Sequence, residues 1–189
     1  MDAIVGFDRS LFYLLNTQLT TTFLDILMPF ITQKSNFIGV IIFGWVLLIL
    51  VGGWKERKAL IIILFVILIS DLSASTLKDI FQRIRPCAEL MNVRLLGGCG
   101  GSYSFPSSHA TNIFAAMVYL SLHYYRFSPI FLTLAILIAF SRVYVGVHYP
   151  LDVVAGAFLG TFIALIFVKA EERFSPYLLD YYKRLKAGN

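Results

Sequence analysis

The stretch SRVYVGVHYPLD, residues 141–152, places three chemically active side chains between two strongly apolar segments. Arg142 follows the apolar run 130–140, His148 comes after five intervening residues, and Asp152 lies at the start of the next apolar run. Such residues are costly at a membrane boundary unless they serve a purpose. Arginine binds anionic oxygens through a planar fork, histidine can act as a nucleophile, and aspartate can fix the histidine tautomer. The grouping therefore indicates chemistry on a phosphate.

Local geometry supports this interpretation. Pro150 is well suited to the first position of a helix, with Tyr149 as the cap, so that Asp152 falls in the first turn. There the carboxylate interacts well with the helix dipole and can reach back toward His148. Taken alone, the stretch is equally compatible with a helix-start acid and an arginine that anchors the interface.

The composition is that of an integral membrane protein. The chain has 189 residues, of which 58% are hydrophobic and 14% charged, and the mean hydropathy is +0.77. Soluble domains contain about 25% charged residues. The net charge is +5, but the basic residues form short clusters between apolar runs, which predicts membrane topology and no nucleic-acid partner. The first nine residues lack the pattern of a cleavable signal peptide.

Five apolar segments are expected to cross the membrane as helices, because each approaches the length of about 20 residues that a span requires. They are residues 36–53, 59–80, 108–124, 129–145 and 151–168. The sequence therefore predicts an all-α, polytopic transmembrane helix bundle.

The two ends of the chain are expected to lie outside the bundle. Residues 1–35 form an N-terminal amphipathic region at the interface, although a sixth span within residues 1–33 is an alternative. Residues 36–170 form the transmembrane catalytic domain. Residues 171–189 are a basic cytoplasmic tail, with an interfacial helix expected to start at Ser175.

The basic clusters predict the orientation. With five spans, the loop 54–58, the turn near Arg126 and the basic stretch 183–186 share one side, which the positive-inside tendency assigns to the cytoplasm. The loop 83–107 and the connection 141–149 then lie on the outer face. This outer face also carries basic residues, which an anionic substrate would explain: Lys78, Arg83, Arg85, Arg94 and Arg142.

A second constellation, Lys78-Asp-Ile-Phe-Gln-Arg-Ile-Arg85-Pro86, closes the second predicted span. Lys78 and Arg85 are seven residues apart, which is two helical turns, so we expect them to share one helix face. Pro86 is expected to mark the end of this helix. Alone, the pair is also compatible with interfacial cations that extend toward water.

A third constellation, Phe105-Pro106-Ser107-Ser108-His109, opens the third predicted span. A serine before an apolar helical run is a typical cap, and the free N–H groups of a helix start bind anions. His109 would then lie beside a bound phosphate. The alternative is an ordinary capped helix with an interfacial histidine. All three constellations fall at helix ends on the same membrane face, and this agreement favours one shared site.

The order Lys-x6-Arg-Pro, Pro-Ser-x-His and Ser-Arg-x5-His-x3-Asp resembles the type 2 phosphatidic acid phosphatase superfamily of membrane lipid phosphatases. The resemblance covers roughly residues 59–168. It implies that His148 is the nucleophile that forms a phosphohistidine and that Asp152 orients it. It further implies that His109 protonates the leaving oxygen and then activates water. The implied phosphate-binding residues are Lys78, Arg85, Ser107, Ser108 and Arg142.

One position departs from this pattern, because the family usually has glycine where this chain has Ser108. The side chain of a serine hinders the close backbone approach to a phosphate that glycine allows, although the N–H can still donate. Phosphoryl transfer depends mostly on positioning and on neutralising charge. Three cations and a helix start can supply this, and no carboxylate cluster suits Mg²⁺. We expect no metal and no other cofactor.

The predicted function is an integral membrane phosphatase of the bacterial inner membrane, with its active site facing the periplasm or the outside. The resemblance implies substrates such as undecaprenyl pyrophosphate, phosphatidylglycerol phosphate, phosphatidic acid or the 1-phosphate of lipid A. A lipid phosphotransferase that uses the same site is one alternative. A non-enzymatic transport or lipid-binding relative is another, although all three catalytic residues are present. Vanadate-dependent haloperoxidases have a similar site but are soluble.

Two further features leave alternatives open. Cys87 and Cys99 lie in the outer loop, where an oxidising compartment would allow a disulfide, or they are two free thiols. Asp71 lies within the second predicted span. An acid at that depth is either functional or hydrogen-bonded to a neighbouring helix.

Overall fold

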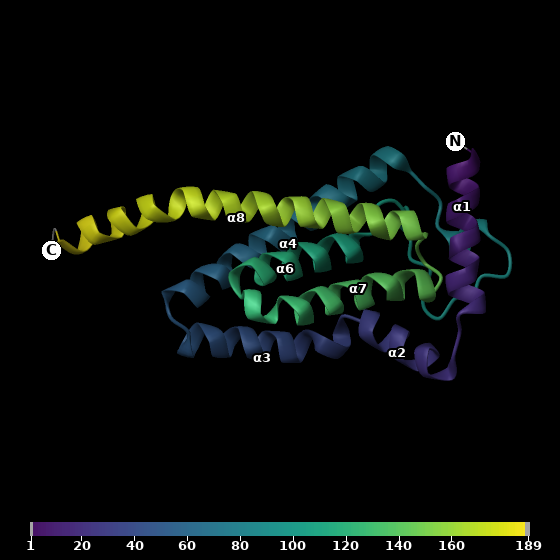
Figure 1. The fold of residues 1–189 in the computed structure, drawn as a ribbon, viewed down its shortest axis with the longest axis horizontal. Helices are drawn as coiled ribbons and strands as arrows, with labels where there is room; N and C mark the ends of the chain where they lie inside the picture. Colours follow the sequence, from purple (N-terminus) through teal and green to yellow (C-terminus); the bar gives the residue numbers. More distant parts are fainter. Residues whose placement is uncertain (1, 188–189) are drawn as a thin grey trace.

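The computed structural model describes the backbone of residues 2–187 and the side chains of residues 3–174. Within that backbone every regular element is a helix, which confirms the all-α prediction (Figure 1). In chain order the elements are α1 (Asp2–Tyr13), the π-helical turn η1 (Leu14–Gln18), α2 (Thr22–Thr32), α3 (Ser35–Val51), α4 (Trp54–Phe81), α5 (Pro86–Glu89), α6 (Ser108–His123), the 3₁₀ turn η2 (Tyr125–Phe127), α7 (Ser128–Tyr144) and α8 (Pro150–Ala187).

Helix α6 is the centre of the bundle. It packs most extensively against α8, then against α7 and α4. Figure 1 shows these helices running side by side, with α3 alongside and α1 lying across one end. At this same end the chain enters α6 and α8 and leaves α4 and α7. Residues from distant parts of the sequence are thereby gathered at one end of the molecule, which we call the active-site end.

The contact between α6 and α8 is close because two glycines one helical turn apart lie between the helices. A Cβ atom added to Gly156 would lie 2.6 Å from the carbonyl oxygen of Ser107. A Cβ atom added to Gly160 would lie 2.1 Å from the carbonyl oxygen of Thr111. Small residues four positions apart let helix backbones approach each other in this way in membrane proteins. The pair therefore sets the distance between the beginnings of α6 and α8.

The lengths of the apolar helices identify the membrane-spanning part. Among the described residues, three segments are long and apolar enough to cross a membrane, namely Trp54–Glu89, Tyr125–Tyr144 and Pro150–Phe174. Helices α2 and α3 meet at a bend of 51° and pass the same test only as a pair. Helices α3 and α6 have 17 and 16 residues, fewer than the roughly 20 of a typical span. Three or four spans are thus supported, and the predicted count of five is not confirmed.

The N-terminal segment packs tightly on the active-site end. The side chain of Asn16 is fully buried. Its amide donates to the carbonyl oxygens of Arg94, at 2.9 Å, and Tyr144, at 2.8 Å. Asp25 accepts from the guanidinium of Arg94 at 2.7 Å and from the hydroxyl of Tyr144 at 2.5 Å. These contacts join η1 and α2 to the end of α7 and to the loop before α6.

The end of the chain differs from the prediction. Helix α8 continues without a break from Pro150 to Ala187, so the separate interfacial helix expected to start at Ser175 is wrong. Residues 169–173 have good helix propensity and extend the span, and the helix continues through Pro176 although a proline there removes one backbone hydrogen bond. The side chains of residues 175–189 lie outside the described part, and the cytoplasmic placement of the tail stays a prediction.

The glycine contact generates a stability prediction. We expect Gly160→Ala to lower the free energy of unfolding by about 1–3 kcal/mol, because its methyl group must displace the α6 backbone. The matched control is Gly44→Ala on α3, where an added Cβ meets no atom within 4 Å. Thermal unfolding of the detergent-purified proteins measures both effects. Equal melting temperatures for the two variants would contradict the assigned role of the contact.

Candidate active site

His148 is positioned by a tight turn after α7. Gly146 has φ of +88°, a conformation that glycine adopts at no steric cost. A Cβ atom there would also lie 2.7 Å from the carbonyl oxygen of Arg94. The N–H groups of Val147 and His148 then donate to the carbonyl oxygen of Arg142, at 3.2 and 3.3 Å. This turn directs the His148 side chain into the protein, where the residue is only 2% exposed.

Asp152 lies beside His148. Helix α8 begins at Pro150, and Asp152 is in its first turn, as predicted. One carboxylate oxygen, Oδ2, accepts from the N–H of Tyr149 at 2.8 Å and lies 3.6 Å from Nδ1 of His148. The hydroxyl of Ser104 donates to the same oxygen. Asp152 is thus held on the Nδ1 side of the imidazole ring.

Ser104 is a site residue that the sequence reasoning missed. It is fully buried, and its Oγ lies 3.5 Å from Nδ1 of His148 while it bonds Asp152. Its position one residue before the Phe105 to His109 constellation is the only sequence signal that points to it. A serine in a glycine-rich loop resembles any other turn residue, because such loops are generally rich in serine.

Lys78 and Arg85 approach the site from the end of α4 and from the loop that follows. The Lys78 ammonium donates to the carbonyl oxygens of Tyr103, at 2.7 Å, and Ser104, at 3.3 Å. Arg85 donates through Nε to the carbonyl oxygen of Ser102 at 2.7 Å. Its Nη1 lies 3.5 Å from Nε2 of His148. The Nε2 side of the imidazole therefore faces a cation.

The prediction that Lys78 and Arg85 share one helix face is wrong. Helix α4 ends at Phe81, and Gln82 has φ of +48°. Arg85 has extended backbone and caps the short helix α5. Pro86 keeps Arg85 extended, but the left-handed Gln82 already ends α4, before the helix end predicted at Pro86. The two cations still meet, because the left-handed residue turns the chain back toward the bundle.

Arg142 contributes a third cation from the last turn of α7. Its Nη1 donates to the hydroxyl of Thr32 at 2.6 Å, and its buried Nε has no hydrogen-bond partner within the protein. Lys78, Arg85 and Arg142 bond only neutral oxygens: among the described residues, no carboxylate lies within 4.0 Å of their charged nitrogens. Arg83, by contrast, forms ion pairs with two carboxylates. The first three charges are thus left available for an anion.

The beginning of α6 completes the site. Ser107 caps this helix by accepting from the N–H of Ala110 at 3.5 Å, and its own N–H donates to the carbonyl oxygen of Asp152 at 2.9 Å. Ser108 and His109 are the first two residues of α6, and both are half-buried. His109 lies within electrostatic reach of four groups: Arg142, Lys34, His148 and Arg85. All eight residues singled out in the sequence therefore lie at the active-site end.

Burial determines the charge state of His148. Loss of hydration lowers the pKa of its imidazole to about 4, against the opposing effect of the Asp152 carboxylate. The imidazole is therefore neutral at physiological pH, with one ring nitrogen free of a proton. A neutral imidazole is the form that can act as a nucleophile.

Two open alternatives are resolved by the structure. Cys87 and Cys99 form a disulfide, which connects α5 to the loop that carries Ser102 and Ser104. Asp71 accepts a hydrogen bond of 2.8 Å from the side-chain amide of Asn112, so the helix-to-helix hydrogen bond is confirmed for this acid. The disulfide lies next to Arg85 in the chain and limits the movement of the loop to which Arg85 bonds.

Comparison with known proteins identifies the family of this chain. The sequence model of the PAP2 superfamily matches residues 59–175, which include all three constellations. These residues make up more than half of the chain. The protein is a membrane hydrolase of the lipid phosphatase class. The chain belongs to the PAP2 superfamily.

Individual relatives extend the likeness beyond the matched segment. An undecaprenyl-diphosphatase from Sulfolobus acidocaldarius is 33% identical over 88% of this chain and 80% of its own length. A lipid A 4'-phosphatase from Bacteroides thetaiotaomicron is 32% identical over 81% of this chain and 75% of its own. The crystal structure of Aquifex aeolicus LpxE has a TM-score of 0.73 and 27% identity, covering 85% of this chain and 93% of that one. The fold of this chain thus closely matches that of a solved relative.

The buried, neutral His148 generates a pH prediction. Its pKa is about 4 in the folded protein against an ordinary 6.5, so the unfolded chain binds more protons between these values and stability falls as the pH drops. The cost at pH 4.5 is about 2.5 kcal/mol. We expect His148→Gln to remove it, so that thermal unfolding shifts in favour of the variant between pH 7 and 4.5. Parallel melting curves for the two proteins would refute the burial argument.

Proposed function

We propose that this protein hydrolyses a lipid phosphate monoester or diphosphate through a phosphohistidine formed on Nε2 of His148. The observation that carries the proposal is the charge imbalance around this nitrogen. Lys78, Arg85 and Arg142 lack carboxylate partners within the described part of the chain. Uncompensated cations beside a buried nucleophile would be unfavourable unless an anion binds between them. A phosphoryl group supplies both the charge and the electrophile.

The two ring nitrogens of His148 have different surroundings. Nδ1 lies near the Asp152 carboxylate, at 3.6 Å, so this nitrogen carries the proton and Nε2 is left with a free lone pair. Nε2 lies 3.5 Å from the Arg85 guanidinium, on the side of the cations. In the proposed first step Nε2 attacks phosphorus, and the bond from phosphorus to the leaving oxygen breaks. Asp152 stabilises the positive charge that develops on the imidazole.

His109 is the proposed proton carrier. In the first step His109, which the bound anion favours in its protonated form, donates that proton to the leaving oxygen. In the second step the neutral imidazole takes a proton from the water that attacks the phosphohistidine, which restores the protonated form. The second step releases inorganic phosphate and restores the free imidazole. Three cations and the N–H groups at the start of α6 neutralise the phosphoryl oxygens in both transition states. We assign Ser107 and Ser108 to this cradle.

We further propose that the site faces the extracytoplasmic side of a bacterial inner membrane. Basic clusters at the opposite end of the bundle support this orientation through the positive-inside tendency. In this arrangement α3 and α6 also cross the bilayer, which makes five spans, and residues 1–35 lie at the interface. Helix α6, with 16 residues, has a length of about 24 Å, so its ends would lie near the edges of the hydrocarbon core.

The position of the site at a membrane surface favours a substrate with a hydrated head group and a tail that stays in lipid. The names of two relatives point to prenyl diphosphates and phosphorylated lipid A as members of this class. Phosphatidylglycerol phosphate and phosphatidic acid also belong to the proposed set, because each carries a phosphate monoester like that of lipid A. A diphosphate places a second anionic group beside the same three cations, so we propose undecaprenyl diphosphate as the first substrate to test.

The mechanism predicts that His148→Ala lowers phosphate release by at least about a thousandfold, because the nucleophile is removed. The matched control is His123→Ala, since His123 lies at the other end of α6 and bonds Glu171 at 2.8 Å. Phosphate release by detergent-purified protein in EDTA measures both. Full activity of His148→Ala, or loss of wild-type activity in EDTA, would contradict the metal-independent mechanism.

A substrate panel under the same conditions tests the lipid specificity. We expect undecaprenyl diphosphate to be hydrolysed with a higher kcat/KM than phosphatidic acid or phosphatidylglycerol phosphate. Rapid quenching with a ³²P-labelled substrate should trap an acid-labile, base-stable phosphoenzyme. Transfer of the label to an added lipid alcohol in preference to water would favour the phosphotransferase instead.

A further inference from the structure

We propose that Asp8 and Arg83 are positioning residues for Asp152, so that the N-terminal helix α1 is a functional part of the active site. This inference rests on the proposed function, in which Asp152 orients His148. Asp8 lies outside the constellations recognised in the sequence, and Arg83 lies within the second one without a role of its own. Arg83 forms a direct ion pair with Asp152, and Asp8 forms one with Arg83.

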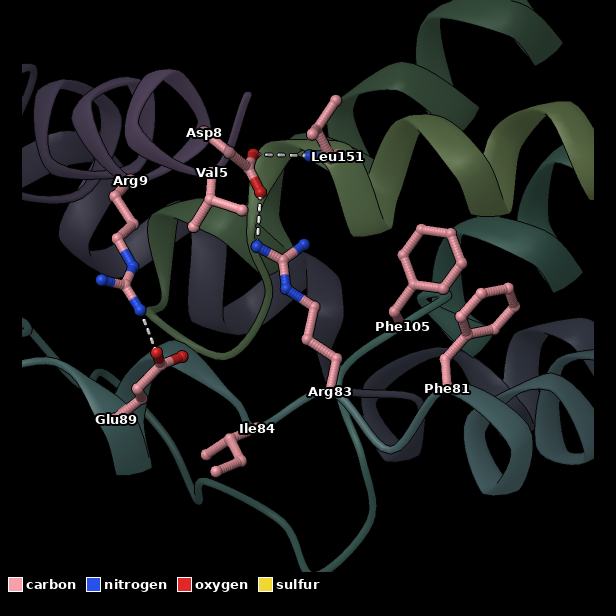
Figure 2. A pocket seen from close by; sticks show the side chains of 9 residues that line it. All are labelled: Val5, Asp8, Arg9, Phe81, Arg83, Ile84, Glu89, Phe105 and Leu151. Atoms are coloured by element: carbon pink, nitrogen blue, oxygen red, sulfur yellow. Dashed lines mark hydrogen bonds and ion pairs between the residues drawn. The ribbon is translucent and has the colours of Figure 1, made fainter. Parts of the chain in front are cut away.

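Arg83 bridges two carboxylates on different helices. Its Nη1 lies 2.7 Å from Oδ1 of Asp152, and its Nη2 lies 2.6 Å from Oδ2 of Asp8. The guanidinium also lies over the ring of Tyr149, 3.9 Å from the ring centroid. Figure 2 shows Asp8 from α1 and Arg83 from the loop after α4 facing each other. Both carboxylates are fully buried, while the Arg83 side chain is 23% exposed, so the ion pairs are only partly screened by water and salt.

Asp8 also holds the helix that carries Asp152. Its other oxygen, Oδ1, accepts from the N–H of Leu151 at 2.9 Å (Figure 2). This N–H is one of the four at the start of α8 that have no partner within the helix. Asp8 therefore caps α8 from outside the helix, one residue before Asp152. The same carboxylate fixes both the backbone and, through Arg83, the side chain of the orienting residue.

The orientation of the Asp152 carboxylate depends on this bridge. Oδ2 faces His148 because it is bonded to the N–H of Tyr149 and the hydroxyl of Ser104. Oδ1 is held by Arg83. Rotation of the carboxylate would break all three contacts together. Arg83 can oppose this rotation only while its own guanidinium is fixed. Asp8 fixes it by pairing with Nη2.

Charge balance gives Asp8 a second effect on His148. An Arg83 paired with Asp152 alone would neutralise the carboxylate that stabilises the imidazolium. With Asp8 included, two negative charges flank one positive charge, and a net negative charge remains beside His148. Electrostatic interactions of this kind are strong away from water. Removal of the Asp8 charge would weaken the polarisation of His148 even if no atom moved.

A cavity beside Arg83 leaves room for its side chain to move, so a restraint by Asp8 would keep it on Asp152. A cavity of about 470 Å³ adjoins its side chain, and it is the space viewed in Figure 2. The lining is largely apolar and comes from α1, the end of α4, the following loop and the start of α8: Val5, Asp8, Arg9, Phe81, Arg83, Ile84, Glu89, Phe105 and Leu151. An arginine without Asp8 would have room to swing toward this space and its acid, Glu89.

The test is Asp8→Asn, because asparagine keeps the side-chain oxygen that caps Leu151 and loses only the charge that pairs with Arg83. We expect kcat on the lipid substrate to fall by about ten- to a hundredfold, because the orienting group is misplaced. KM should stay within about twofold of the wild type, since Asp8 touches no phosphate-binding residue. An unchanged kcat, or a rise in KM alone, would overturn the proposal.

Asp79→Asn is the matched control, since Asp79 is an exposed acid near the same end of α4 and its loss should leave kcat unchanged. Arg83→Gln should lower kcat at least as much as Asp8→Asn. The double variant should be no slower than Arg83→Gln alone, because both residues act through Asp152. Additive losses would show that Asp8 acts by another route. If Asp8→Asn fails to fold, Arg83→Lys, which can hold only one carboxylate at a time, should give the same kcat loss at unchanged KM.

A measurement without turnover separates this proposal from the proposed function. Histidine ¹⁵N NMR of the purified protein reports the tautomer of His148, with His148→Gln identifying its signals. The wild type should carry its proton on Nδ1, and Asp8→Asn should show a mixture of tautomers. An unaltered tautomer in Asp8→Asn would overturn the positioning role, whether or not the wild type hydrolyses a lipid phosphate. A wild type with the Nδ1 proton but no hydrolysis would refute the proposed function alone.

Discussion

Helices α6 and α8 lie so close together at Gly156 and Gly160 that their backbones are almost in contact. In a membrane this approach contributes packing where the hydrophobic effect contributes little. It also brings two helix starts together, because the N–H of Ser107 at the start of α6 donates to the carbonyl oxygen of Asp152 in α8. His109 and His148 reach one site only because these two starts are joined. Any residue larger than glycine in the contact would separate them.

Charge at the active-site end is distributed in two distinct ways. Arg83 is fully compensated by Asp8 and Asp152 and serves the protein itself. Arg85 and Arg142 bond neutral oxygens, and their charge is left for a ligand. Arg83 and Arg85 are only two residues apart, so a count of basic residues cannot tell the paired arginine from the available one. Their hydrogen-bond partners distinguish them, because a buried ion pair fixes geometry, whereas a cation without an acidic partner creates an anion site.

The motif residues could be predicted because their chemistry is local. Pro150 begins a helix by its fixed backbone angle, and Ser107 caps one by its hydroxyl, so both helix starts were predicted correctly. The partners of Asp152 could not be predicted, because Ser104 and Arg83 reach it from parts of the chain that only tertiary packing brings together. Regular periodicity misled at Arg85, where one left-handed residue ended the helix that the spacing assumed. The number of membrane spans was not confirmed either, because only three or four segments of the described chain are long and apolar enough to cross a membrane.

Helix α8 is a single rod of 38 residues, about 57 Å long, and it behaves mechanically as a lever. Asp152 lies near one end, and Glu171, roughly 28 Å along the axis, is tied to the rest of the bundle by Lys58, Tyr119 and His123. A stiff rod converts a small change of angle at one anchor into a displacement at the other. One degree of tilt over this distance moves the carboxylate by about 0.5 Å, which is the tolerance within which catalytic groups must be held. Because three residues share this remote anchor, the alignment of Asp152 does not depend on any single one of them.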